Sequence, residues 1–202
     1  MTSIAVAVLV AAVQAGSASE AVQKTQEKVR GSLSAWFKSE GPARTKAKEQ
    51  ARKAVSELID FDSLAKATLG KKWDEISAKE RARYTTALKG AMEANYLAKM
   101  RQGKSGDVDK IRVEVLGEEP QGERALVHTK VHSGEDTASI DYVMEKAPKG
   151  WRAVDVFTEG VSLAETYREQ VGKLLQKKSL NDVIATLDRK RKQLEADLDK
   201  QG

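Results

Sequence analysis

The sequence contains two histidines and no cysteine, and this restricts the chemistry open to it. Thiol nucleophiles, disulfides and zinc sites built from cysteine are excluded. His128 and His132 are four residues apart in a segment that alternates apolar and polar residues, so both should point away from the face that carries Val127 and Val131. Because no third metal ligand stands at a suitable spacing, we interpret the histidines as a solvent-facing pair rather than a metal site.

Asp141 and Asp155 are the carboxylates whose surroundings most favour acid–base catalysis. Each lies in a strand-like segment, where it alternates with residues such as Tyr142, Val154 and Val156. This alternation favours surface or hydrogen-bonded structural roles over catalysis. The sequence also has no glycine-rich phosphate loop, nucleophile elbow or HExxH motif. We therefore expect a protein that is not an enzyme, with no catalytic residues, no metal site and no cofactor.

The charged residues are mixed along the chain. Thirty-five Lys and Arg residues against 30 Asp and Glu residues give a net charge of +5, without the basic stripe of a nucleic-acid-binding protein. We interpret most of these charges as solvated helix faces, and we expect no nucleic-acid partner.

The first 19 residues carry no charge, and they contain an apolar run from Ile4 to Val13 followed by small residues. This pattern indicates a secretory signal peptide, although no basic residue precedes the apolar run. The run is short for a bilayer span. Cleavage near Ala15 or Ala18 would release a soluble exported protein, with residues 20–202 as a single domain. The alternative is an N-terminal apolar helix that stays in the fold.

Apolar residues at helical spacing fill the first half of the chain. Helices are expected over residues 20–37, over the segment after Gly41 and Pro42, over 61–69, and from the capping box Ser77–Glu80 onward. The last of these presents large residues at four-residue intervals, namely Tyr84, Leu88, Met92 and Tyr96. Two further helices should begin near Ser162 and Ser179, and the final one has a charged end over about residues 186–202.

The hydrophobic period changes from 3.6 to 2 after about residue 107. Alternating segments at 110–117, 124–131, 138–145 and 150–157 are joined by short glycine-containing connectors, which predicts an antiparallel meander of about four strands. Helices, then strands, then helices is an α+β order. We expect a twisted antiparallel sheet covered by helices on one face.

Two motifs resemble those of one protein family. The stretch "WRAVDVFTEGVSLAETYREQV" (151–171) is a tryptophan-containing strand that runs into a capped helix, and "DFDSLAKATLGKKWDEISAKERARYTTAL" (60–88) precedes it at the expected distance. Together they closely resemble the MlaC, or toluene-tolerance auxiliary component, family of periplasmic phospholipid-binding proteins. The resemblance covers about residues 20–185.

The resemblance implies a twisted sheet of the nuclear-transport-factor-like type, with helices enclosing an apolar cavity for acyl chains. It implies a periplasmic phospholipid carrier of an ABC transport system that maintains outer-membrane lipid asymmetry. The expected partners are phospholipid, the lipid-binding ring component of an inner-membrane ABC transporter and an outer-membrane lipoprotein complex. We expect a monomer that docks transiently, with exposed residues such as Lys71, Lys72 and Arg101 as candidate contacts.

Candidate cavity residues come from the matching motifs and from the large side chains. The motifs supply Leu69, Trp73, Tyr84, Leu88, Tyr96, Val154, Val156 and Val161. The large side chains add Met92, Tyr142, Met144 and Tyr167. By the same resemblance, Gly160 is a turn residue and Ser162 a helix cap. All twelve candidates could equally fill an ordinary core.

Two other functions remain open from the residues alone. An enzyme on a cone-shaped α+β fold would use Asp155 with Tyr142 or Asp141 as a polar pair inside the cavity. A periplasmic scaffold or chaperone would have a solid core and no cavity.

Overall fold

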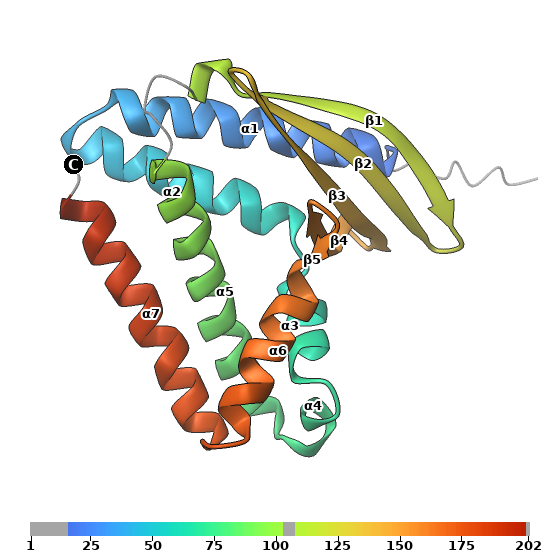
Figure 1. Ribbon diagram of the computed structural model, residues 1–202, viewed down its shortest axis with the longest axis vertical. Helices are drawn as coiled ribbons and strands as arrows, with labels where there is room; N and C mark the ends of the chain where they lie inside the picture. Colours follow the sequence, from blue (N-terminus) through green and yellow to red (C-terminus); the bar gives the residue numbers. More distant parts are fainter. Residues whose placement is uncertain (1–15, 103–107, 201–202) are drawn as a thin grey trace, which may run out of the picture.

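Seven helices and one open sheet form the part of the chain that the computed structural model describes, residues 16–102 and 108–200 (Figure 1). Five helices come first: α1 Ala18–Lys38, α2 Gly41–Leu58, α3 Phe61–Leu69, α4 Lys72–Glu75 and α5 Ala78–Gln102. A short 3-10 turn, Val108–Lys110, leads into the sheet. Helices α6 Leu163–Leu175 and α7 Leu180–Lys200 follow it. The predicted α+β order is confirmed.

Side-chain caps fix where the helices begin. Ser17 accepts a hydrogen bond from the backbone nitrogen of Glu20, and Asp60 accepts from those of Asp62 and Ser63. The predicted capping box at the start of α5 is present, with Ser77 and Glu80 each accepting from the other's backbone nitrogen. Gly70, at a φ of +56°, ends α3 in the left-handed region that favours glycine.

The sheet is an antiparallel meander in the order β1-β2-β3-β4-β5. Its strands are β1 Arg112–Gln121, β2 Arg124–Ser133, β3 Asp136–Ala147, β4 Gly150–Thr158 and β5 Val161–Ser162. The four predicted strands are thus confirmed. The sequence did not predict β5, which is only two residues long, or the single-turn helix α4.

One face of the sheet is apolar and faces the helices. Val127 pairs with Tyr142, which in turn pairs with Val156, so an inward-facing row crosses the three central strands. Helix α1 crosses this face, with α2 beside it, and α5 and α7 pack together on the opposite side of the molecule (Figure 1). Helices α3 and α6 pack side by side below the sheet.

The buried residues form two clusters. The sheet-side cluster joins the inner face of the sheet to α3, α5, α6 and the start of α7, and it includes Leu64, Tyr84, Leu88, Val127 and Met144. The helix-end cluster joins α1 and α2 to the ends of α5 and α7, and it includes Val29, Leu33, Trp36, Leu97 and Leu198. Helix α5 contributes to both clusters, and four consecutive residues near its middle, 91–94, are buried, which is the pattern of a central helix.

The expected signal peptide falls mostly outside the described residues. Of residues 1–19, only Gly16–Ser19 are described, and helix α1 already begins at Ala18.

Candidate functional site: an apolar hollow between α5 and the sheet

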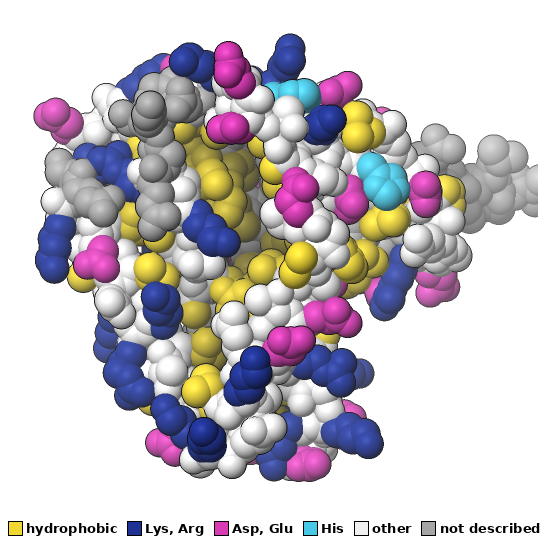
Figure 2. Space-filling model, in the orientation of Figure 1, with side chains coloured by type: hydrophobic (Ala, Val, Ile, Leu, Met, Phe, Trp, Pro, Cys, Tyr) yellow, Lys and Arg dark blue, Asp and Glu magenta, His cyan; other side chains and the backbone are white. Residues whose placement is uncertain are grey.

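The face shown in Figure 2 is hollowed between α5 on one side and the sheet with α6 on the other, and hydrophobic side chains gather inside the hollow. The hollow follows from the packing. Helix α5 packs chiefly on α2, α3 and α7, whereas the sheet packs on α1, α2, α3 and α6, so α5 and the sheet face each other without close backbone packing.

Partly exposed apolar residues that pack against the two clusters are suited to wall such a hollow. They come from the sheet, from α5 and α6, and from the turn before β1: Ile111, Val115, Ile140, Val156, Tyr96, Met100, Leu163 and Tyr167. An apolar residue that touches the core and still keeps some exposure has no protein atoms on one side. An apolar ligand would therefore bury surface that the fold leaves open.

Most of the sequence-derived candidates meet in the sheet-side cluster. The buried candidates are Leu69, Tyr84, Leu88, Met92, Tyr142 and Met144, and partly exposed Trp73, Val156 and Tyr167 pack against them. Tyr96 packs against the helix-end cluster. Tyr84, Leu88 and Met144 have no exposed surface and fill the core behind the hollow.

Two candidates lie elsewhere. Val154 has no partner on β3, because Met144 pairs with Ala153 and Val143 pairs with Asp155, which makes Val154 the extra residue of a β-bulge. Val161 is 61% exposed in the short edge strand β5. The role of all twelve candidates in lining a ligand cavity remains a prediction.

Tyrosine hydroxyls supply most of the polarity near the hollow. The Tyr142 hydroxyl accepts a hydrogen bond from the Gln26 side-chain amide of α1, and Tyr167 is hydrogen-bonded to Asn95. The Tyr96 hydroxyl has no hydrogen-bond partner among residues 16–102 and 108–200. Burial raises the pKa of Tyr96 to about 12, and the side chain stays partly exposed.

Sequence reasoning missed Gln26, although it lies on the buried stripe of α1. Val22, Gln26, Val29 and Leu33 follow one another at intervals of four, three and four residues, so the stripe has one polar member. A polar residue within an apolar stripe was the signal that could have identified it.

The junction between β4 and α6 is held by Asp155. Its carboxylate accepts hydrogen bonds from the Ser162 hydroxyl at 2.6 Å and from the Ala164 backbone nitrogen at 3.0 Å. Ser162 in turn accepts from the Glu165 backbone nitrogen at 3.0 Å, so it caps α6 as predicted. Gly160, at a φ of +75°, makes the preceding turn. The geometry gives Asp155 a structural role at the helix start.

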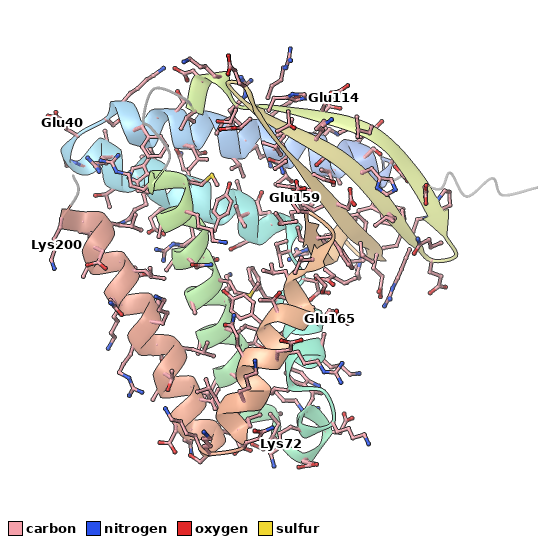
Figure 3. The ribbon with its side chains drawn as sticks, in the orientation of Figure 1. Glu40, Lys72, Glu114, Glu159, Glu165 and Lys200 are labelled. Atoms are coloured by element: carbon pink, nitrogen blue, oxygen red, sulfur yellow. The ribbon has the colours of Figure 1, made fainter. Side chains whose placement is uncertain are left out.

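The two histidines lie on the outer face of the sheet, as expected. His128 Nδ1 is 3.1 Å from the Asp141 carboxylate, and His132 Nε2 is 3.1 Å from that of Glu114. Figure 3 labels Glu114 on β1, on the side of the sheet away from α5. Within the described ranges, no group of three or more His, Cys, Asp or Glu side chains is arranged to hold a metal ion.

Glu93 is a buried carboxylate that the sequence did not single out. It is 6% exposed, and it faces α2, where it accepts a hydrogen bond from the Ser56 hydroxyl and lies 3.9 Å from the Arg52 guanidinium. Burial raises the pKa of Glu93, and the Ser56 hydrogen bond with the positive charges of Lys89 and Arg52 opposes the shift. Arg52 also pairs with Glu195 at 3.1 Å, so this network ties α2, α5 and α7 together.

Two surface grooves have a different character from the hollow. One, of about 430 Å³, lies between α1 and α2 and is bordered by Glu27, Lys28, Lys53 and Glu57. The other, of about 420 Å³, lies between α5 and α7 and includes Lys79, Arg83 and Asp188. Their charged rims suit them poorly to hydrocarbon.

Two of the three charged candidates for docking lie away from the hollow. Lys71 and Lys72 are exposed at the start of α4, and Figure 3 shows Lys72 at the end of the molecule opposite α1 and the sheet. Lys72 pairs with Glu75 at 2.8 Å. The Arg101 guanidinium lies over the Phe37 ring, 5.4 Å from its centre. In the described part of the chain, no helix is both long and apolar enough to cross a membrane.

Comparison with known proteins agrees with this architecture. A solved structure described as the phospholipid-binding protein from Ralstonia solanacearum in complex with a phospholipid superposes with a TM-score of 0.75 at 17% sequence identity. The match covers 89% of this chain and 99% of that one, and it shows a shared fold. No curated protein matches the chain. The sequence model of the family described as MlaC protein matches residues 23–189, and the chain therefore belongs to the MlaC family.

Proposed function

We propose that this protein is a phospholipid carrier that holds acyl chains in the hollow between α5 and the sheet. The observation that carries the proposal is an apolar hollow in a member of the MlaC family. The bound phospholipid of the Ralstonia solanacearum protein, which shares the fold, supports the same ligand class.

The energetics suit a carrier without catalytic groups. Burying hydrocarbon stabilises by about 0.8 kcal/mol per CH₂, so two acyl tails need shielding on the order of 20 kcal/mol to cross water. Apolar walls provide that shielding, and neither a metal nor a cofactor is required. The Asp155 carboxylate caps α6 instead of forming an acid–base pair with Tyr142, which favours a carrier over the enzyme considered above.

We further propose that the carrier works in the periplasm, where it exchanges lipid with the lipid-binding ring of an inner-membrane ABC transporter and with an outer-membrane lipoprotein complex. Charge distribution supports docking through the helical part of the molecule. Residues 112–162 contain 6 Lys and Arg against 10 Asp and Glu, whereas the rest of the chain contains 29 against 20. The helices therefore present the excess positive charge to a partner.

A matched pair of substitutions on β3 tests the site. Ile140 and Val143 lie on the same strand but on opposite faces of the sheet. Ile140 packs against the sheet-side cluster, whereas Val143 pairs with Asp155 of β4 and faces away from the helices. Ile140→Trp should fill part of the hollow and weaken binding of a fluorescent phospholipid at least 10-fold. Val143→Trp should bind as the unmodified protein does.

The result that would overturn the proposal is phospholipid binding that is absent in the unmodified protein or equal in both variants. A protein that binds no lipid but retains unfolded polypeptides would instead match the scaffold alternative. Circular dichroism and urea unfolding of each variant separate loss of binding from loss of fold.

A further inference from the structure

The four tyrosines of this chain differ in how their hydroxyl groups are satisfied. The Tyr84 hydroxyl lies 2.8 Å from that of Thr68, inside a core where Tyr84 has no exposed surface. Tyr142 is bonded to Gln26, and Tyr167 to Asn95. Of these four hydroxyl groups, only that of Tyr96 has no hydrogen-bond partner within the described residues.

Tyr96 and Tyr142 come from the two walls of the hollow. Tyr142 projects inward from β3, and Tyr96 of α5 packs against the helix-end cluster. Burial, together with the neighbouring Tyr96, raises the pKa of Tyr142. Gln26 reaches the same place from α1, so three different elements bring polar groups to one level of an otherwise apolar space. The two tyrosines also link the sheet-side and helix-end clusters.

The hydroxyl groups of Tyr96 and Tyr142 can each donate a further hydrogen bond. Because the Tyr142 oxygen accepts its hydrogen bond from Gln26, its own proton is available for a second partner. The Tyr96 proton is equally available. An acceptor supplied by the ligand would give these protons a hydrogen-bond partner that the described residues do not provide. The ligand should therefore carry an acceptor next to its apolar chains.

We propose that the hydroxyl groups of Tyr96 and Tyr142 donate hydrogen bonds to an ester carbonyl oxygen of the bound phospholipid, and so distinguish diacyl from dialkyl lipids. The inference rests on the proposed carrier function. An ester carbonyl is the first acceptor above the hydrocarbon of an acyl tail, whereas an ether-linked tail has no carbonyl at that position. The two tyrosines would set how deeply the tails enter the hollow and which linkage is preferred.

The test compares two lipids that differ only in this linkage. Binding of dipalmitoyl phosphatidylglycerol and of its di-O-hexadecyl ether analogue is measured by competition against a fluorescent phospholipid. The unmodified protein should prefer the ester lipid about 3- to 10-fold, the ratio expected for one or two net hydrogen bonds. Tyr96→Phe should reduce this preference by at least half, and Tyr96→Phe with Tyr142→Phe should remove it while ether-lipid binding is retained.

Tyr84→Phe is the matched control, because its hydroxyl is satisfied by Thr68 in the core, and it should leave the preference unchanged. Equal affinity of the unmodified protein for the two lipids would overturn the inference without affecting the carrier function, since the hydroxyls would then meet only water. Failure to bind either lipid would overturn the carrier function itself.

Discussion

At the scale of single residues, Asp155 is the most informative side chain, because an acid–base role and a structural role predict different results for its removal. Asp155→Ala removes the acceptor for Ser162 and Ala164 at the start of α6. We expect a loss of about 1–3 kcal/mol in the free energy of unfolding, measured by urea titration.

Asp136→Ala, at an exposed position beside the turn between β2 and β3, is the control and should be near neutral. If Asp155→Ala leaves stability unchanged, the structural role assigned to this carboxylate is wrong.

Glu93 predicts a specific dependence of stability on pH. Burial raises the pKa of its carboxyl above the ordinary 4.5, so the folded protein holds this proton more tightly than the unfolded chain does. Ionisation of Glu93 therefore opposes folding. Its contribution to stability is fully present below about pH 4.5, is lost as the pH rises through the folded pKa, and stays absent above it.

Glu93→Gln keeps an acceptor for Ser56 and removes the ionisation. We expect the free energy of unfolding of this variant to fall less between pH 4.5 and pH 8 than that of the unmodified protein. Glu135→Gln, at an exposed position in the turn between β2 and β3 and away from Glu93, should follow the unmodified curve. If the free energy of unfolding depends on pH in the same way for the unmodified protein and for Glu93→Gln, the raised pKa assigned to Glu93 is wrong.

At the scale of single residues, the sequence predicted well which side chains face the interior. It predicted poorly which of them border open space. The four-residue spacing placed Tyr84, Leu88, Met92 and Tyr96 on one stripe of α5, and all but Tyr96 are buried. Period and composition cannot distinguish Tyr84, which fills the core, from Tyr96, which borders the hollow. That difference depends on the distance between α5 and the sheet, which is set by packing among elements remote in sequence.

At the scale of elements, the turn between β4 and β5 allows a matched test of backbone strain. Gly160 has a φ of +75°, a conformation that L residues with a side chain rarely adopt, whereas Gly172 lies within α6 and has open space around the position of a Cβ atom. Gly160→Ala should destabilise the protein by about 1–2 kcal/mol. Gly172→Ala should stabilise it by about 0.5–1 kcal/mol through better helix propensity.

Thermal unfolding of the two variants shows whether Gly160→Ala lowers the stability and Gly172→Ala raises it. Equal effects of the two substitutions would mean that the turn does not need the freedom of glycine. Since α6 begins at Leu163, three residues after Gly160, this turn also sets the position of the helix that carries Tyr167.

The sequence predicted elements where the period is regular and failed where it is interrupted. Alternation placed the inward residues of β2 and β3 correctly because a strand fixes a period of two. In β4 the bulge at Val154 changes the register, so this residue, which the family resemblance placed in the cavity, has no partner on β3. A bulge is set by pairing with the neighbouring strand, and that pairing is not visible in the local sequence.

At the scale of the whole molecule, the start of α1 bears on the expected signal cleavage. The carbonyl oxygen of Gly16 accepts a hydrogen bond from Trp151 Nε1 at 2.9 Å, Ser17 caps the helix, and Ala18 is fully buried. These contacts favour cleavage after Ala15 over cleavage after Ala18.

The intact mass of the processed protein should therefore correspond to a chain that begins at Gly16. A truncated protein that begins at Ser19 should unfold at lower urea concentration, because it lacks the cap and the Trp151 contact. A processed chain that begins at Ser19 and is as stable as one that begins at Gly16 would contradict this expectation.

The central claim is that the hollow between α5 and the sheet carries phospholipid, and the most direct measurement is of the lipid that the protein holds when it is isolated. For this experiment the chain is produced with an export signal in the periplasm of a two-membrane bacterium. It is then purified without detergent and examined by native mass spectrometry, followed by organic extraction and lipid analysis. The account predicts a stoichiometric phospholipid. A protein that is free of lipid and also takes none up from phospholipid vesicles would contradict it.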